Sequence, residues 1–444
     1  MVSQYQTNGE RKVTNRRSIL KASAVAFTTT GLAGCSGNGG NGGNGGDSGD
    51  NGAVNGNGAD DSNPIRIGLL SPLSGAWTVY GTAHQRGFEI AIDQVNADGG
   101  VNGREIEIIT EDYETDPQLA TQQAQQLIRQ DDVDVLAGSF SAASRNAVMN
   151  VANQEGIILL FPTFYEGQLQ EEYPGMCNEL LFNFGPTPDQ QAGPWIEQMI
   201  SEHGSSIYYI GSDYSWPRIW RDQLERMLDE RGINDYEFVN TEFMPFGTED
   251  FSATYSSIQN TDPDIVFSTL TGNNAGNFMS GFYSRGLKED YTYWTMNDEE
   301  FTTEGLGPEA SAGTYQSFDY WHTLDTEVNN RLIDDLHSKY GEEAGMNTVG
   351  AAMYNGGIAW AKAANEVGSI ATDDMIPGLE GIEWEGPQGT ITMREQDHQA
   401  MLPSYHAQTR ENWSGFNDMF EILGEEPEPE TPLGDCDYPL QSGN

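Results

Sequence analysis

Residues 65–117 read IRIGLLSPLSGAWTVYGTAHQRGFEIAIDQVNADGGVNGREIEIITEDYETDP. The stretch begins with a short β-rich segment and continues with apolar residues at helical spacing, namely Phe88, Ala91, Ile92 and Val95. Ile106 and Ile108 then alternate with acidic residues, as expected for a strand with one buried face. A strand, a helix and a second strand in this order are typical of a parallel sheet with helices on its faces.

The same alternation continues along the chain of 444 residues, which is long enough for two domains. In the first half we expect helices and strands in turn over residues 116–130, 133–140, 144–154 and 156–164. Prolines then interrupt the pattern, and a second series follows with strands over 205–214, 262–272 and 291–298 and helices over 217–232 and 273–286. Two α/β lobes in tandem are predicted, with a ligand cleft where the loops after their strands face each other.

The charge balance limits the possible partners. The chain has 68 Asp and Glu against 21 Lys and Arg. Such a surface repels phosphates, so we expect no nucleic-acid partner. Concentrated salt shortens the Debye length to roughly 3 Å and screens the mutual repulsion of the carboxylates. The composition therefore indicates adaptation to a very salty medium.

The N-terminus has the pattern of a targeting segment. Arg16 and Arg17 precede a weakly apolar run over residues 22–33, which is shorter than the ~20 apolar residues that a membrane-spanning helix needs. The paired arginines resemble a twin-arginine (Tat) export signal. Residues 32–35 resemble a lipoprotein cleavage box, so residues 1–34 are predicted to be a signal peptide and Cys35 the lipid-bearing first residue. The Gly- and Asn-rich run up to residue 63 is predicted to be a flexible tether.

Two further cysteines, Cys177 and Cys436, lie far apart in the sequence. In an exported protein they could form a disulfide that ties the C-terminal tail to the segment near residue 177, or they could be two separate thiols. Sequence alone does not set their separation, so both alternatives stay open.

Motifs for catalysis are missing. The chain has no G-x-S-x-G elbow, P-loop or H-E-x-x-H pattern, its six histidines are dispersed and its cysteines are too few for a zinc site. The segment DGGVNG, residues 98–103, lacks the closing Glu of a calcium loop and is better explained as a glycine turn. We expect no enzyme activity, no cofactor and no metal, with a secreted hydrolase as a distant alternative.

At this point the motifs resemble a known family. The stretch quoted above resembles the opening of the type I periplasmic binding proteins of the Leu/Ile/Val-binding class. A narrower likeness, to the urea and short-chain-amide branch, is carried by SAASRNAV (141–148), PTFYEG (162–167), GPTPDQQAGP (185–194), YIGSDYSWPR (209–218), VFSTLTG (266–272), AAMY (351–354) and GPQGTITM (386–393).

The resemblance implies a type I periplasmic binding fold, in which two doubly wound parallel-sheet lobes are joined by three hinge crossings. We place the crossings near residues 184–188, 312–316 and 380–388. The N-terminal lobe is then expected over 64–185 with 315–380, the C-terminal lobe over 186–314 with 381–430, and an extended tail over 431–444. The resemblance also implies an extracytoplasmic receptor that delivers a small solute to the permease of an ABC importer. We expect it to be monomeric and, from the pattern around Cys35, anchored to the outer face of the cell membrane by lipid.

Candidate ligand contacts in the first lobe follow the ends of its strands. The loop over residues 138–145 opens a helix, so its backbone N–H groups can receive a carbonyl or carboxylate oxygen. Phe140, Ser141, Ala142 and Ser144 lie in this loop. Ser144 can also be read as a helix N-cap. Ala142 stands where the amide branch usually has Ser, so one hydroxyl contact to the ligand that this branch has is not expected from this position.

The remaining contacts come from both lobes. Thr163 and Tyr165 resemble first-lobe contacts of the family, although Tyr165 could also be a packed aromatic. Trp77 and Tyr80 are expected to roof the site, and Tyr214, Trp216 and Thr271 to close it from the second lobe, with Tyr214 and Trp216 as core aromatics in the alternative reading. Glu300 could accept N–H groups. A Leu/Ile/Val-type ligand would need such an acid to pair with its ammonium group. An amide or urea needs a smaller pocket, and we favour this second ligand class.

Overall fold

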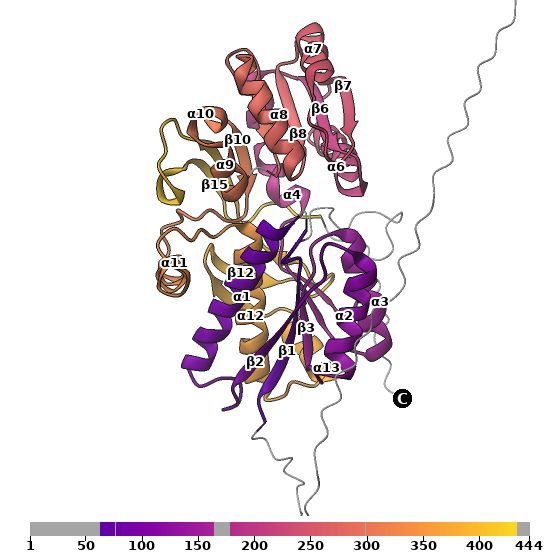
Figure 1. Ribbon diagram of the computed structural model, residues 1–444, viewed down its shortest axis with the longest axis vertical. Coiled ribbons are helices and arrows are strands. Elements are labelled where there is room, and N and C mark those ends of the chain that lie inside the picture. The colour runs from indigo at the N-terminus through magenta and orange to yellow at the C-terminus, as the bar shows by residue number, and fades with distance from the viewer. Residues whose placement is uncertain (1–62, 76, 164–177, 298, 433–444) are drawn as a thin grey trace, which may run out of the picture. The chain divides into compact units, whose positions relative to one another are not determined.

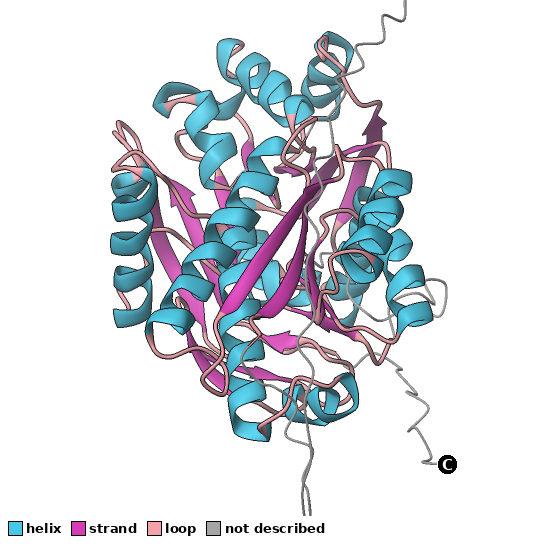
Figure 2. Cartoon of the chain, turned by 60° about the horizontal axis from the view of Figure 1, so that its bottom comes forward, coloured by secondary structure: helices cyan, strands magenta, loops and turns pink. Residues whose placement is uncertain are grey.

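The computed structural model describes residues 63–75, 77–163, 178–297 and 299–432 (Figure 1). Three sheets organise these residues: one of five strands, one of seven and one of three. Helices lie on both sides of the two large sheets (Figure 2). Within the described residues, no helix is both long and apolar enough to cross a membrane.

The first sheet contains five parallel strands in the order β2-β1-β3-β4-β5. These are β1 Ile65–Ser71, β2 Ile106–Asp112, β3 Val135–Gly138, β4 Leu159–Phe161 and β5 Leu181–Asn183. Strand β1 is almost fully buried because it lies between β2 and β3 and helices cover both faces of the sheet. On one side lie α1 (Thr78–Ala97) and α12 (Thr348–Val367), and on the other α2 (Pro117–Arg129) and α3 (Ala142–Glu155) (Figure 1). The predicted parallel sheet is confirmed.

Helices α1 and α12 approach each other closely. A Cβ atom on Gly87 would lie 2.0 Å from the carbonyl oxygen of Gly350, so glycine is required for this contact. Polar contacts add to it, since the Tyr354 hydroxyl donates to Gln94 Oε1 at 2.7 Å. The N-terminal end of α1, which carries Tyr80, is therefore held on a rigid frame.

The second sheet has the order β15-β14-β10-β9-β8-β6-β7. Strands β6 to β10 pair in parallel, whereas β14 and β15 join antiparallel at one edge. The strands are β6 Ser206–Ser212, β7 Glu237–Met244, β8 Ile265–Thr269, β9 Thr292–Thr295, β10 Tyr315–Phe318, β14 Ser404–Thr409 and β15 Phe420–Glu426. Its α-helices are α5 Ile196–His203, α6 Ser215–Glu230, α7 Ser252–Thr261, α8 Asn273–Ser284, α9 Glu300–Leu306 and α10 Pro308–Ser311. Short 3₁₀ turns are η1 Gly193–Trp195, η2 Leu287–Glu289 and η3 Phe416–Asp418.

A small antiparallel sheet joins the first lobe. It consists of β11 Glu383–Gly386, β12 Gly389–Met393 and β13 Ala400–Met401. Trp384, Ile391 and Met393 of this sheet are buried in the same apolar core as β1 and β3. The remaining helices are α4 Pro188–Gln191, α11 Glu327–Tyr340 and α13 Thr372–Leu379.

The strand pairing corrects the predicted positions of two crossings. We had assigned residues 315–318 to the first lobe. Strand β10 pairs with β9 and β14, so these residues belong to the second sheet instead. The chain returns only before α12. Because β11 and β12 pack on the first core, we place the third crossing after β13 instead of near 380–388. We therefore propose one lobe over residues 63–183 with 348–402 and another over 188–318 with 404–426.

Two arginines tie segments together near the crossings. Arg226 on α6 donates to both carboxylate oxygens of Asp189 on α4, at 2.8 and 2.7 Å, and the Asp189 side chain is only 5% exposed. Arg394, which follows β12, pairs with the buried Asp397 and donates to the carbonyl oxygens of Thr431 at 2.7 Å and Pro432 at 3.1 Å. The segment after β15 thus runs from the second sheet back to the first lobe.

Candidate functional site

A small cavity lies where the loops after the strands of the two large sheets meet. Its volume is about 30 Å³. The first lobe contributes loops after β1, β3 and β4, and the second lobe loops after β6, β8 and β9. The lining residues are Trp77, Tyr80, Phe140, Ser141, Ala142, Thr163, Tyr214, Trp216, Thr271 and Asn297. Nine residues predicted as ligand contacts are therefore brought together in one place.

The loop before α3 is shaped by its backbone. Gly138 and Ser139 both have positive φ, at 96° and 68°. A Cβ atom on Gly138 would lie 2.2 Å from the carbonyl oxygen of Leu70, so only glycine fits there. The strained Ser139 is buried, and its hydroxyl donates to Ser144 Oγ at 2.8 Å. This turn aims the start of α3 at the cavity.

Ser141 and Ser144 form a capping box at the N-terminus of α3. Ser141 Oγ accepts from the Ser144 N–H, and Ser144 Oγ accepts from the Ser141 N–H, each at 3.1 Å. Ser144 is fully buried and does not line the cavity. The N-cap is Ser141 and Ser144 is the third residue of the helix, so the alternative of Ser144 as the N-cap is wrong, although its hydroxyl takes part in the capping. The next N–H groups of the helix, those of Ala142 and Ala143, need an acceptor from outside the helix. Because Ala142 lines the cavity, a solute oxygen can occupy this place.

Aromatic rings form two walls of the cavity. In the first lobe Tyr80 stacks on Phe140 at 4.7 Å between centroids, and Trp77 lies 5.3 Å from the same ring. In the second lobe Tyr214 and Trp216 stack at 6.2 Å. Such faces suit a flat solute.

Asp112 at the end of β2 holds the loop that leads to Trp77. Its Oδ1 accepts from the backbone N–H groups of Leu73 at 3.0 Å, Ser74 at 3.3 Å and Glu114 at 2.9 Å. Partial burial opposes ionisation, but the hydrogen bonds from Ser74 and from these N–H groups keep the pKa of Asp112 below its usual value. The ionised carboxylate thus holds the backbone of the loop that carries Trp77 in place beside the cavity.

Asn297 is a lining residue that we did not predict. It follows β9, and its Nδ2 donates to the Tyr80 hydroxyl at 3.3 Å. The signal for it was available, because a polar residue directly after a buried strand of a parallel sheet belongs at the ligand edge.

The lining side chains of the described part of the chain are all uncharged. His84, which lies behind Phe140 at 5.9 Å, is buried, and this burial lowers its pKa to about 3, so that it is neutral as well. The lining residues carry neutral polar groups: hydroxyls on Ser141, Thr163, Thr271, Tyr80 and Tyr214, indole N–H groups on Trp77 and Trp216, and the carboxamide of Asn297.

The structure does not place Glu300 at the cavity, contrary to our expectation. The carboxylate is fully buried and accepts from the His322 N–H at 2.8 Å, which joins the start of α9 to the segment after β10. Burial raises the pKa of Glu300 well above its usual value. Tyr165, Cys35, Cys177 and Cys436 lie outside the described residues, so their predicted roles stay predictions.

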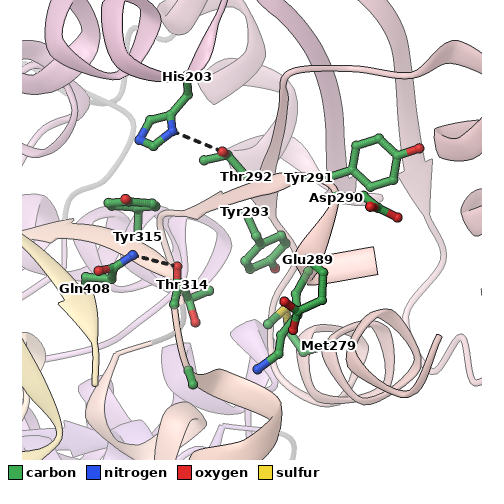
Figure 3. Close-up of a pocket in the computed structure, with 13 residues that line it drawn as sticks. His203, Met279, Glu289, Asp290, Tyr291, Thr292, Tyr293, Thr314, Tyr315 and Gln408 are labelled. Carbon is green, nitrogen blue, oxygen red and sulfur yellow. Dashed lines mark hydrogen bonds between the residues drawn. The ribbon is translucent and has the colours of Figure 1, made fainter. Parts of the chain in front are cut away.

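A larger crevice of about 280 Å³ opens at the opposite ends of β9 and β10 (Figure 3). There His203 Nδ1 and the Thr292 hydroxyl share a hydrogen bond of 3.2 Å. All of its lining residues belong to the second lobe, and none of the predicted contacts lies there. The cavity between the lobes is therefore the better candidate site.

Comparison with known proteins agrees with this geometry. A family model described as periplasmic binding protein matches residues 64–414. This chain belongs to the periplasmic binding protein family. A solved structure shares its fold: an amino acid ABC transporter substrate-binding protein from Pseudomonas fluorescens has a TM-score of 0.75 at 21% identity, and the match covers 85% of this chain and 100% of that protein. The predicted fold class is thus confirmed.

Other proteins are similar to half of the chain or more. An amino acid binding protein of Pseudomonas aeruginosa is 26% identical over 57% of this chain and 67% of its own length. A Leu/Ile/Val-binding protein homolog of Brucella abortus is 26% identical over 50% of this chain and 56% of its own length. A solute binding protein of an ABC transporter from Rhodopseudomonas palustris, in complex with 3,4-dihydroxybenzoic acid, has a TM-score of 0.73 at 19% identity. The match covers 84% of this chain and 99% of that protein. These relatives and structural neighbours are described as proteins that bind solutes.

Proposed function

We propose that this periplasmic binding protein is the extracytoplasmic receptor of an ABC importer and that its solute is a small, neutral, planar molecule such as a short-chain amide or urea. The observation that carries the proposal is the uncharged, aromatic lining of the cavity between the two lobes. A carbonyl oxygen would accept from the N–H groups at the start of α3, and hydroxyls such as Thr163 and Thr271 would meet the remaining polar atoms.

The competing ligands fit less well. The ammonium of a free amino acid needs a carboxylate, and Glu300 is bound to His322 instead. An aromatic acid carries a carboxylate, and the lining residues of the described part of the chain include no cationic side chain to pair with it. A ligand of the Leu/Ile/Val type remains the alternative solute.

We also propose how the receptor is attached to the membrane. Cys35 would carry the lipid that anchors the chain, and residues 36–63 would give a reach of roughly 30 Å, enough to dock on a permease. A disulfide between Cys177 and Cys436 and a monomeric state belong to the same proposal.

Solute binding should be visible as stabilisation. We expect acetamide or urea to raise the melting temperature of the full chain by several degrees in molar salt, because a ligand at 100 times its Kd adds about 2.7 kcal/mol. Calorimetry should give one site per chain without turnover. Tetramethylurea, which has no N–H and is bulkier, is the control. Stabilisation by leucine or benzoate with none by amides would contradict the neutral-solute proposal.

Salt dependence is a second consequence. With 68 acids against 21 basic residues, lowering the salt from 1 M to 0.1 M lengthens the Debye length from roughly 3 to 10 Å and restores the repulsion between surface carboxylates. We expect a large fall in the melting temperature over this range, measured by circular dichroism. A melting temperature that is constant from 0.1 to 2 M would argue against adaptation to salt.

A further inference from the structure

One hydrogen bond joins the two lobes directly across the cavity. Tyr80 lies on α1 of the first lobe, and Asn297 follows β9 of the second. Asn297 Nδ2 donates to the Tyr80 hydroxyl at 3.3 Å. Both residues are almost buried, with 6% of Tyr80 and 8% of Asn297 exposed. A neutral bond in such a place is shielded from competing water.

Each end of this bond is held by its own lobe. The Tyr80 ring stacks on Phe140 at an interplanar angle of 14°, so its hydroxyl has a fixed direction. On the other side the Asn297 N–H donates to Thr295 Oγ1 at 3.4 Å, and the Met296 N–H donates to the Ser268 carbonyl of β8 at 3.1 Å. Separation of the lobes would therefore break the bond, since neither end can follow the other.

The Asn297 side chain has a second polar atom for a solute. A carboxamide carries one oxygen and one nitrogen, and here the nitrogen is used for Tyr80. Within the described residues, no hydrogen bond of the protein to Asn297 Oδ1 is present, although the residue lines the cavity. The oxygen can thus accept from an N–H group of a solute. It is an acceptor on the second lobe, whereas the donors at the start of α3 belong to the first lobe, and both residues line the cavity.

We propose that Asn297 couples solute selection to closure: its Nδ2 latches the second lobe onto Tyr80 while its Oδ1 selects solutes that carry an N–H group. The selection half of this inference rests on the proposed function, whereas the latch half holds for any solute. A solute that bonds to Oδ1 holds the carboxamide in the orientation that latches, so binding favours the closed form.

Two substitutions in the full chain separate the two roles. Tyr80→Phe keeps the stacked ring and removes the latch, and Asn297→Ala removes both the latch and the acceptor. Acetamide and acetone are the probes, because acetone has a methyl group in place of the NH₂. Asn234→Ala, an exposed change in the second lobe, is the matched control. Affinities come from calorimetry, and the openness of the ligand-free proteins comes from small-angle X-ray scattering.

We expect Tyr80→Phe to weaken acetamide and acetone by the same factor, about 3- to 10-fold, as for one neutral hydrogen bond. Asn297→Ala should weaken acetamide by about 10-fold more than acetone, which abolishes the preference for acetamide. Both substitutions should increase the radius of gyration of the ligand-free protein, and Asn234→Ala should not.

Three results would overturn the inference. An unchanged radius of gyration and affinity in Tyr80→Phe excludes the latch. An unchanged acetamide-to-acetone ratio in Asn297→Ala excludes selection by Oδ1. If the wild type binds neither probe, the proposed solute class and the selection role fall together, and the scattering comparison alone then decides the latch.

Discussion

Arg226→Met should lower the free energy of unfolding by about 3–5 kcal/mol, because it leaves the Asp189 carboxylate buried without its partner. Asp189 is 5% exposed at its side chain and receives two hydrogen bonds from this guanidinium. Burial already raises the pKa of Asp189, against the opposing effect of Arg226. Removing Arg226 takes away the larger of the two arginine effects that favour ionisation at this position, since Arg231 also lowers the pKa of Asp189. Urea denaturation at constant high salt measures the change.

Arg218→Met is the control for this experiment. Arg218 lies on the same helix and pairs with Asp213 at 2.6 Å, but both side chains are about half exposed, at 53% and 45%. Such a pair contributes about 0–1 kcal/mol. The double change Asp189→Asn with Arg226→Met should recover part of the loss, because no unpaired charge remains. If Arg226→Met and Arg218→Met lower the free energy of unfolding equally, the buried pair stabilises the fold no more than the exposed pair, and the prediction is wrong.

Asp319→Asn should remove a pH dependence of stability. Asp319 is fully buried after β10, where it accepts hydrogen bonds from the Thr348 hydroxyl and from Gln388 Nε2. Burial raises its pKa from 3.8 to about 7. The folded state therefore binds this proton more tightly than the unfolded state does, so stability falls as the pH rises from about 4 to 7.

The size of this effect follows from the shift in pKa. A shift of about 3 units corresponds to about 4 kcal/mol lost between pH 4 and pH 8. Glu300, Tyr320 and Tyr405 are the titratable neighbours, and all of them have raised pKa values. Asparagine mimics the protonated acid, so the variant should gain on the wild type as the pH rises. The exposed change Asp325→Asn should leave the wild-type slope intact. Parallel stability curves for the wild type and Asp319→Asn would contradict this.

Much of the site could be predicted because parallel sheets place function at one edge. Once residues 65–117 indicate a strand, a helix and a strand, each loop after a strand becomes a candidate, and Ser141, Thr163 and Thr271 follow from this rule. Asn297 obeys the same rule and was overlooked beside the more conspicuous acids that follow it.

Other features needed contacts that sequence does not contain. The run at residues 313–321 reads as a strand, but its sheet depends on pairing with β9 and β14, which are distant in sequence. Glu300 stood out as a carboxylate near a strand end, and its real partner is a backbone N–H 22 residues later. Ser144 was ambiguous because capping and solute binding favour the same residue type at a helix start.

The contact of Arg394 with Thr431 and Pro432 acts as a tether with a fixed length. Strand β15 ends at Glu426 on the second sheet, and the backbone at Thr431 and Pro432 is fastened to the first lobe. A fully extended chain gains at most about 3.6 Å per residue, so the six steps from Glu426 to Pro432 span about 20 Å. While Arg394 holds its two carbonyls, the lobes cannot move further apart than this along that edge. The amplitude of opening is thus limited by a count of residues, in addition to any stiffness of the hinges.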